Sequence, residues 1–578
     1  MQAARGFTTY ATDVLVVGGG LAALRAALSA RQAGARVLIA VKRRLGRSGS
    51  SANTTGGFAA AVEDVNPFDN PQLHYRDTIV GGGFINERDL VRRLCEEASA
   101  RLAELWQLGA SFRRRDGRYH VSPSGDHSQP RVFVPENMRG TDMTAPLREA
   151  AIAAGIEVLE NVAIVELLRD GERVAGALGI ARDRIEGIAI IAGATVLAAG
   201  GAGRLFTITS NPVDVCGAGF ALALRAGARL RDMEFIQFYP WRLIRPFKST
   251  RVPIQPSTFV LGARLINSRG ERFMERYDCA RKDAAPRDIS ARAIFDQIRH
   301  GVAIAGGVRL DVSAVPDEQF RYENSRVVEL LDARGIDYRK IELVVAPEAH
   351  FFMGGVVIDQ DGRCDIAGLY AAGETAGGVH GGNRLNSNAV PETQVIGHRA
   401  GLSAASHVRA RNHFDPAPVE IWRRHLDRVQ EDSAACSDEF DSLLEELRAA
   451  MTVGLGIVRS GDGLRAARAF ADKLRARAEA LPTRSQGDLI ARAEICDLCT
   501  VAIACAESAL MRKESRAAHY REDFPKLDPG WQRTIFCSRA GLQSCPVASD
   551  FEEADWAAAM DQQHRVQVAQ PGAKEFVE

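Results

Sequence analysis

Glycine-rich turns follow three apolar stretches of the sequence and could hold a nucleotide. The first, "VLVVGGGLAALRAAL", fits Gly18-x-Gly20-x-x-Ala23 between a strand-like run and a helical run. Glycines there let backbone amides approach a pyrophosphate, and the helix start adds a partial positive charge. The acid that would hold an NAD ribose about 20 residues later is missing, because the next strand ends in Val41-Lys42. The motif indicates a dinucleotide other than NAD, and a tight turn without a ligand is the alternative.

The two later turns favour FAD. "TVLAAGGAGRLF" carries Ala199, Gly200 and Gly201, and "GLYAAGETAGG" ends its apolar run at Gly373-Glu374. Three such turns, separated by long stretches of chain, suggest one long cofactor lying across one sheet. We expect Glu374 to accept hydrogen bonds from flavin ribityl or ribose hydroxyls. An exposed loop acid is the alternative.

Hydrophobic periodicity indicates which elements position these turns. Residues 13–43 read as a β-α-β unit, and the prolines from Pro240 onward suggest an inserted domain. Further expectations are helices at 88–108 and around 144–154, strands in "IEVLENVAIVELL" and "GATVLAAGG", a helical stretch at about 415–516, and a loop-rich tail from about 517. The alternation of strands and helices predicts an α/β fold.

Composition excludes several classes of protein. The 578 residues are 46% hydrophobic and 25% charged, and 73 basic residues balance 73 acidic ones. This balance argues against nucleic-acid binding and against a polybasic membrane anchor. No apolar run approaches the length of a membrane span, and the first residues lack the apolar segment of a signal peptide. We therefore expect a cytoplasmic protein without direct membrane insertion.

Ten cysteines are scattered along the chain, as in an intracellular enzyme with reduced thiols. Cys496, Cys499 and Cys505 form one cluster in a helical stretch. A metal site there would lack a nearby fourth ligand, so we expect buried structural cysteines and no metal.

Eight stretches together resemble the succinate dehydrogenase/fumarate reductase flavoprotein family, which includes L-aspartate oxidases. They span about residues 13–525 in the family order: "VLVVGGGLAALRAAL", "SSANTTGGFAAA", "VLAAGGAGRLF", "ALALRAGARLRDMEFIQF", "APRDISARAI", "HFFMGGV", "YAAGETAGGVHGGNRLNSN" and "RKESRAAHYREDFP". The resemblance implies a Rossmann-like FAD-binding domain, an inserted α+β capping domain and a helical domain. The expected division is 1–239 and 350–412 for the FAD-binding domain, 240–349 for the capping domain, 413–516 for the helical domain and 517–578 for a C-terminal segment.

The resemblance also implies how FAD is held. Covalent members of the family carry a histidine six residues before the Gly56-Gly57 pair, where this chain has Ser50. No histidyl bond can form there, so we expect non-covalent FAD. A helix beginning near Asn388 would point its positive end at the flavin. The implied cofactor-binding set is Gly18, Gly20, Ala23, Lys42, Ser50, Thr55, Gly56, Gly57, Ala199, Gly200, Gly201, Glu374, Arg384, Ser387 and Asn388.

Three residues match the family's catalytic positions. Arg287, in "PRD", resembles the proton-donating arginine, and His350 and Arg384 resemble the pair that binds a substrate carboxylate. Arg384 can offer a carboxylate two parallel N–H bonds. A structural role for each residue is the alternative.

The opposite end of the expected pocket departs from the family. Relatives read roughly "EFVQFHPT" where this chain reads "EFIQFYPW", so Tyr239 replaces a histidine and Trp241 a threonine. The family's proton-relay stretch aligns with "QPSTFVLGA", which begins at Gln255 and contains no acid and no arginine. We expect Tyr239, Trp241 and Gln255 to line the substrate pocket, with the last three residues of "EFIQFYPW" turning into it. The substrate's far end is then uncharged or aromatic, unless Arg242, Arg245, Lys248 and Arg251 bind a larger anion or a partner. A solvated loop is the alternative for these four residues.

These matches predict an FAD-dependent oxidoreductase that transfers a hydride between flavin N5 and a C–C bond next to a carboxylate. The substrate is a small carboxylate-bearing molecule other than plain succinate or fumarate. The alternatives are amino acid oxidation of the L-aspartate oxidase type, or a flavoprotein subunit of a larger electron-transfer complex. A flavin-bearing subunit that has lost its chemistry is a further alternative, disfavoured by Arg287, His350 and Arg384. An iron-sulfur or other electron-transfer subunit is a plausible partner.

Overall fold

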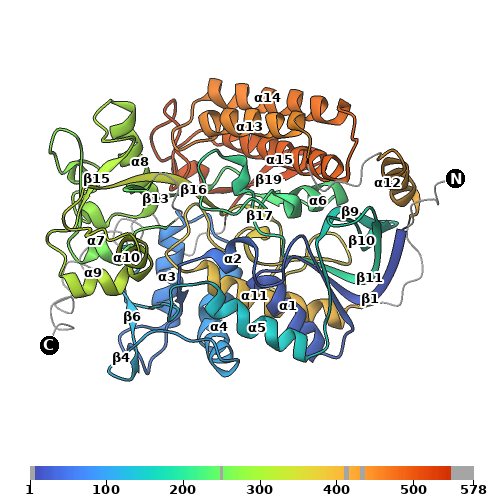
Figure 1. Cartoon of the computed structure of the whole chain (residues 1–578), viewed down its shortest axis with the longest axis horizontal. Helices are drawn as coiled ribbons and strands as arrows, with labels where there is room; N and C mark the ends of the chain where they lie inside the picture. The colour runs from blue at the N-terminus through green and yellow to red at the C-terminus, as the bar shows by residue number, and fades with distance from the viewer. Residues whose placement is uncertain (1–6, 248–251, 409–414, 430–435, 548–578) are drawn as a thin grey trace.

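A mostly parallel sheet forms the centre of the nucleotide-binding part of the computed structural model, which describes residues 7–247, 252–408, 415–429 and 436–547 (Figure 1). Its strand order is β8-β2-β1-β11-β10-β9, and β18 pairs with the end of β11. The bounds are β1 Phe7–Val17, β2 Val37–Val41, β8 Glu157–Glu160, β9 Val162–Asp170, β10 Arg173–Ala181, β11 Gly187–Leu197 and β18 Leu369–Ala371. Strands β1, β11 and β18 are parallel neighbours, with Val17 opposite Leu197 and Leu197 opposite Ala371. The three predicted glycine-rich turns therefore meet at one edge of one sheet, as expected.

Helices cover this sheet and set the position of the turns. Helix α1 (Leu21–Gln32) packs along α11 (Ala389–Ser406), and a Cβ on Gly401 of α11 would lie 2.2 Å from the carbonyl oxygen of Ala26. Only glycine permits this close approach of two helices. The other elements of this part are α2 Gly49–Asn53, β3 Phe58–Ala59, α3 Pro71–Gly81, α4 Arg88–Gln107, β4 Arg114–Arg115, β5 Arg118–Tyr119, β6 Val121–Ser122, β7 Val132–Phe133, α5 Thr141–Ala153 and α6 Ala218–Ala226. The helices predicted at 88–108 and near 144–154 are therefore confirmed.

The capping domain is built on a second sheet of order β13-β16-β15-β14 with a hydrophobic cluster of its own. Its elements are β13 Ile236–Arg245, α7 Ser257–Val260, β14 Arg264–Ile266, α8 Arg287–Arg299, β15 Val308–Asp311, α9 Asp317–Glu323, α10 Ser325–Asp332 and β16 Leu343–Phe352. The expectation that "EFIQFYPW" leaves its strand and turns into the pocket at its last three residues is wrong, because β13 continues to Arg245. Pro240 is accommodated within the strand by a register shift between Tyr239 and Arg242, as proline in a strand requires.

Helices α13 (Asp438–Gly454), α14 (Gly461–Ala480) and α15 (Gln486–Met511) form a bundle along the top of Figure 1, and α12 (Ala417–Asp427) lies apart from it. The sequence suggested a loop-rich tail, but the tail also contains two strands. Strands β19 (Arg533–Ser538) and β20 (Gly541–Pro546) form a hairpin, and β19 pairs with β12 (Leu230–Arg231), which also pairs with β17 (Gly355–Val356). Pairing with β12, which lies far earlier in the sequence, explains why this segment is extended.

Candidate active site

A continuous cavity runs from the glycine-rich turns to the capping domain. Most of the predicted residues line it: Gly18, Gly20, Lys42, Ser50, Thr55, Gly56, Gly57, Ala199, Gly200, Tyr239, Gln255, Arg287, His350, Glu374, Arg384 and Ser387. Four predicted residues are not part of its wall: Ala23, Gly201, Trp241 and Asn388.

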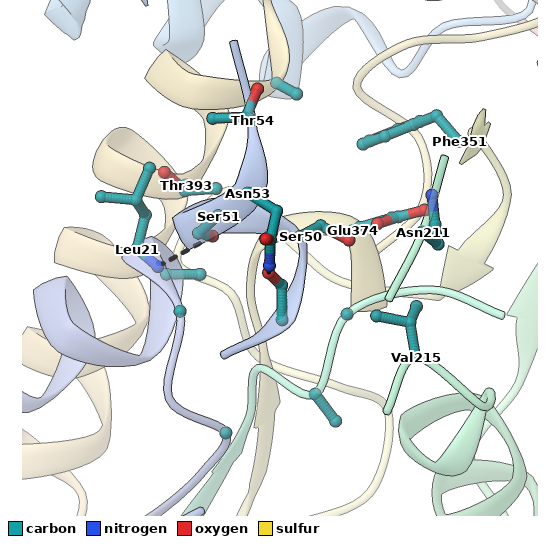
Figure 2. Close-up of a pocket in the computed structure, with 18 of the residues that line it drawn as sticks. Leu21, Ser50, Ser51, Asn53, Thr54, Asn211, Val215, Phe351, Glu374 and Thr393 are labelled. Atoms are coloured by element: carbon teal, nitrogen blue, oxygen red, sulfur yellow. Dashed lines mark hydrogen bonds between the residues drawn. The ribbon is translucent and has the colours of Figure 1, made fainter. Parts of the chain in front are cut away.

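The first turn leaves the start of α1 open to the cavity. Gly18 has φ +132°, and a Cβ there would lie 2.1 Å from the carbonyl oxygen of Ala198. Gly20 precedes α1 without a side-chain cap, while Ser51 of α2 accepts a hydrogen bond from the Leu21 amide at 3.1 Å (Figure 2). A helix start that lacks a cap from its own Gly20, together with the absence of glycine side chains, fits the pyrophosphate of a dinucleotide.

The predicted residues outside the wall have packing roles. Ala23 is fully buried inside α1. A Cβ on Gly201 would lie 2.2 Å from Oε1 of Glu374, so the glycine makes room for that carboxylate. The Asn388 side chain bonds Nε2 of His74 at 2.8 Å and Oγ1 of Thr78 at 3.0 Å, which fixes the start of α11. Sequence matching identified these positions but could not separate contact with a ligand from support of the wall.

Glu374 projects into the cavity after β18 (Figure 2). Its Oε1 accepts a hydrogen bond from the Phe352 amide at 3.0 Å. Burial raises the pKa of Glu374 to about 7, against the opposing effects of that amide and of Arg384. A carboxyl group held this way fits a cofactor hydroxyl, which can donate to its remaining oxygen lone pairs.

Lys42 and Ser50 both line the cavity, but only Lys42 has hydrogen-bond partners for its polar group. The Lys42 ammonium lies 3.0 Å from Glu494 of α15 and 3.0 Å from Sγ of Cys216, so much of its charge is already paired. Ser50 of α2 has a buried Oγ without a hydrogen-bond partner among the described residues. An unpartnered buried hydroxyl in the wall of a cavity indicates a ligand that supplies the partner.

A second loop pair closes the middle of the cavity. The Gly57 amide donates to Oγ of Ser387 at 3.1 Å, and Ser387 has φ +63°. The Gly56 amide donates to Oγ1 of Thr54 at 3.0 Å. The Gly57 bond joins the loop after α2 to the loop before α11, and the Gly56 bond lies within the first of these loops. Pro391 occupies the first turn of α11, as predicted, where the missing proline N–H leaves no bond unmade.

Two arginines converge at the capping-domain end of the cavity. Nη1 of Arg287 and Nη2 of Arg384 donate to the same atom, Oε1 of Gln237, at 3.1 and 3.0 Å. Nη2 of Arg287 also donates to Oδ1 of Asn386 at 2.5 Å. The Nε atoms of both arginines are buried without a partner among the described residues. Burial, followed by the charge of Arg287, lowers the pKa of Arg384 to about 9.

His350 lies beside this pair on β16. Its Nδ1 is 2.7 Å from Oγ of Ser210. Burial, with the charges of Arg384 and Arg287, lowers the pKa of His350 well below its usual value. The imidazole is therefore neutral, and it offers hydrogen bonds without adding a positive charge.

Tyr239 lies between these groups. Its hydroxyl donates to the carbonyl oxygen of Ile254 at 2.6 Å, its ring is 5.1 Å from that of His350, and the Arg287 guanidinium lies 4.9 Å from its centroid. Burial raises the pKa of Tyr239, so the phenol stays neutral. The ring holds the Arg287 guanidinium by a cation–π contact, and the neutral phenol adds no positive charge to the site.

Of the two other residues predicted to line the substrate pocket, Gln255 lines the cavity and Trp241 does not. The placement of Trp241 in the pocket is wrong, because its ring stacks on Phe259 at 4.4 Å in the capping core and it does not line the cavity. The ring of Trp241 packs edge-on against that of Tyr239, with the two centroids 5.6 Å apart, so Tyr239 lines the cavity and Trp241 lies behind it. Gln255 lines the cavity and donates from Nε2 to Oγ1 of Thr55 at 3.3 Å, which links the capping domain to the loop after α2.

The basic run that begins within β13 is partly paired. Arg245 bonds Glu342 at 2.7 Å, and Nε of Arg242 lies 3.6 Å from buried Glu348. Lys248 and Arg251 lie outside the described residues. The two described arginines therefore have carboxylate neighbours of their own.

The cysteine cluster lies on α15, where Cys499 and Cys505 are buried and Cys496 is partly exposed. Within the described ranges, no group of three or more His, Cys, Asp or Glu side chains could hold a metal ion. In the same ranges, no helix is both long and apolar enough to cross a bilayer.

Several residues at the substrate end were not predicted from the sequence. Gln237 and Asn386 lie inside motifs that were recognised, one in "EFIQFYPW" and one in "NRLNSN", so motif membership was a usable signal. Ser210 and Asp126 carried no such signal. They reach the site only through the folding of distant segments.

The fold and this cavity together define an FAD-dependent oxidoreductase. A family model described as "FAD binding domain" matches residues 13–390, and one described as "Fumarate reductase flavoprotein C-term" matches residues 444–553. The chain belongs to the succinate dehydrogenase/fumarate reductase flavoprotein family, as the motifs predicted, and FAD is its cofactor.

Two similar proteins illustrate the range of the family. One subunit of the fumarate reductase (CoM/CoB) of Methanothermobacter marburgensis is 39% identical over 539 residues, covering 92% of this chain and 97% of that protein. An L-aspartate oxidase of Caulobacter vibrioides is 36% identical over 535 residues, covering 90% and 95%. Among solved structures, a variant of E. coli quinol fumarate reductase FrdA matches with a TM-score of 0.87 at 27% identity, covering 95% of this chain and 99% of that one.

Proposed function

We propose that the protein transfers a hydride between FAD and a C–C bond next to a carboxylate, in an acid other than succinate or fumarate. The observation that carries this proposal is the convergence of Arg287 and Arg384 on one oxygen of Gln237. Each guanidinium still has a buried Nε without a partner among the described residues. A substrate carboxylate would supply acceptors for these donors.

The residues divide the work as follows. Arg384 and neutral His350 hold the carboxylate, so that charge developing next to it is stabilised. Arg287 is held by Gln237 and Asn386 and gives a proton to the carbon beside the one that exchanges hydride. Bound FAD supplies the hydride chemistry at flavin N5. Glu374, Ser50, Ser387 and the glycine turns form the part of the cavity that would hold FAD.

The far end of the substrate carries no negative charge in this proposal. Tyr239 is neutral and its hydroxyl already donates to Ile254. With His350 also neutral, Arg384 assigned to the first carboxylate and Arg287 to proton transfer, the described wall at this end leaves no further cation for a second carboxylate. The proposal therefore favours a monocarboxylic acid with an uncharged or apolar far end.

FAD is held without a covalent bond in this proposal, because Ser50 cannot form the histidyl link. Acid precipitation of the purified protein should release all of the yellow chromophore into the supernatant. Chromophore that stays with the precipitate would contradict the non-covalent assignment.

Turnover with matched acids tests the proposed reaction. Crotonate and fumarate share a double bond beside a carboxylate, and only fumarate carries a second one. Reduced protein should be reoxidised by crotonate faster than by fumarate, and the visible absorbance of the oxidised flavin reports the change. Rapid turnover of fumarate or succinate would contradict the altered substrate, and peroxide formed from L-aspartate would favour the amino acid oxidase alternative.

An external electron-transfer subunit completes this proposal. The relative from M. marburgensis is named as one subunit of its enzyme, and the cysteine cluster of α15 is mostly buried in a helix rather than arranged around a metal. Affinity purification from the native cell should recover a second protein with bound iron and sulfide. A homogeneous, fully active preparation of this chain alone, with a physiological donor, would argue against it.

A further inference from the structure

Asp126 is a buried acid beside the two arginines and has no role in the function proposed above. It is 6% exposed and lies in the loop after β6. Its Oδ2 accepts a hydrogen bond from the Asn386 amide at 2.7 Å, and its Oδ1 accepts one from Oγ of Ser124 at 2.5 Å. Asp126 does not line the cavity itself. It therefore acts on the site through Asn386 and through its charge.

Asn386 links this carboxylate to Arg287. While its backbone amide donates to Asp126, its side-chain Oδ1 accepts from Nη2 of Arg287. Asn386 lines the cavity, and Arg287 is 4% exposed. The Asp126 carboxylate thus fixes the backbone of Asn386, because a charge-assisted hydrogen bond restricts its amide. The Asn386 side chain in turn orients Arg287.

The charge of Asp126 also acts on both guanidinium groups. The charges of His127 and Arg287, together with the hydrogen bonds from Ser124 and Asn386, outweigh burial and lower the pKa of Asp126, which keeps it ionised. Its charge in turn favours the charged form of Arg384. Within this group, the two guanidinium groups and the one carboxylate leave a single net positive charge, and the buried Glu348 of the cavity wall lies 3.6 Å from Nε of Arg242.

We infer that Asp126 is a positioning and specificity-determining residue, which aims Arg287 through Asn386 and restricts the substrate to one negative charge. A monocarboxylate neutralises the remaining positive charge, whereas a dicarboxylate places a second anion in a site that Asp126 has already made less positive. This inference rests on the proposed function and names its substrate class. It also places an acid next to Arg287 in a chain whose "QPSTFVLGA" stretch has none.

The test is Asp126→Asn, which removes the charge and keeps both hydrogen bonds, because the Ser124 hydroxyl can turn and accept from the new amide. The FAD-loaded proteins are titrated with crotonate and fumarate, and the perturbation of the flavin spectrum gives each Kd without turnover. The ratio of the two affinities should shift toward fumarate by about tenfold, the order expected of one charge acting through a partly solvated interior. Asp126→Ser, which can still accept from the Asn386 amide, replaces the first variant if that variant loses FAD.

A second readout separates this role from a structural one. The alkaline limit of crotonate binding, set by the guanidinium of Arg384, should move to lower pH in D126N, because a charge that favours its protonated form is gone. The other charged or titratable groups that act on or lie beside Arg384 are unchanged in the variant: Arg287, Glu374, Glu392, His350 and Tyr239. A merely structural aspartate would leave this limit in place.

Glu323→Gln is the matched control. Glu323 is also a buried acid (6% exposed), and it accepts hydrogen bonds from Ser257 at 2.8 Å and Ser122 at 3.2 Å, but its charge acts on neither Arg287 nor Arg384. E323Q should keep the native preference and alkaline limit. An unchanged crotonate-to-fumarate ratio and alkaline limit in D126N would overturn the inference, while failure of every carboxylate to perturb the native flavin spectrum would instead overturn the proposed function.

Discussion

Replacing Arg287 by alanine separates chemistry from cofactor binding. The guanidinium makes hydrogen bonds to Gln237 and Asn386 and lies over the ring of Tyr239, and none of these contacts is to the glycine-rich turns. The variant should therefore keep a full complement of FAD. A positioned proton donor contributes about 10² to 10⁴-fold to rate. Since Arg287 also stabilises developing charge, we expect kcat to fall by about 10³ to 10⁴-fold.

The assay is reoxidation of the reduced flavin by crotonate under single-turnover conditions, with FAD content measured by absorbance in the same samples. Arg287→Lys should recover part of the rate, because a lysine keeps the charge but cannot donate in two fixed directions. The alkaline limit of crotonate binding should rise in R287A, since a like charge that lowers the pKa of Arg384 is removed. Arg299→Ala, on the exposed end of the same helix α8, is the control and should retain native activity. A rate for R287A within about tenfold of native would refute this assignment.

Three further predictions concern the walls of the cavity. Gln237→Leu removes the acceptor shared by Arg287 and Arg384 and should destabilise the protein by about 2–3 kcal/mol, which a lower melting temperature would report. Gln237→Glu should restore the stability yet weaken carboxylate binding. An unchanged melting temperature of Q237L would count against the shared acceptor. Tyr239→His adds a group that can be cationic and should improve fumarate binding relative to crotonate, whereas an unaltered ratio would show that this position does not select the substrate. Burial raises the pKa of Glu374 from 4.5 to about 7, so in flavin-free protein its contribution to stability is present below pH 4.5 and is lost as pH rises through 7. Glu374→Gln should remove this part of the pH dependence of the melting temperature, and identical profiles for the two proteins would disprove it.

Some of the predicted residues line the cavity and others only support its wall, and the sequence predicted the first group better than the second. Gly18, Gly20 and Glu374 follow strands that pair directly, so their motifs were enough to bring them to one edge of the sheet. Trp241 was misplaced because its ring packs between Tyr239 and Phe259 in the capping core, and the sequence does not show which of two neighbouring rings faces the cavity. The hairpin at β19 and β20 was missed because its partner strand β12 lies far earlier in the chain, and strand pairing between distant segments leaves little local signal.

The sequence by itself determined the cofactor and the family, because glycine turns in fixed motifs have few other uses. It also predicted the arginines of the candidate site, and the resemblance implied that Tyr239 replaces a histidine. Only the tertiary structure decided what that replacement means. It joined Arg287 and Arg384 through one oxygen of Gln237, and it brought Asp126 behind Asn386 from a loop that carried no motif. The net charge of a buried site is a sum over side chains from distant segments, so folding, not sequence order, sets which anions it accepts.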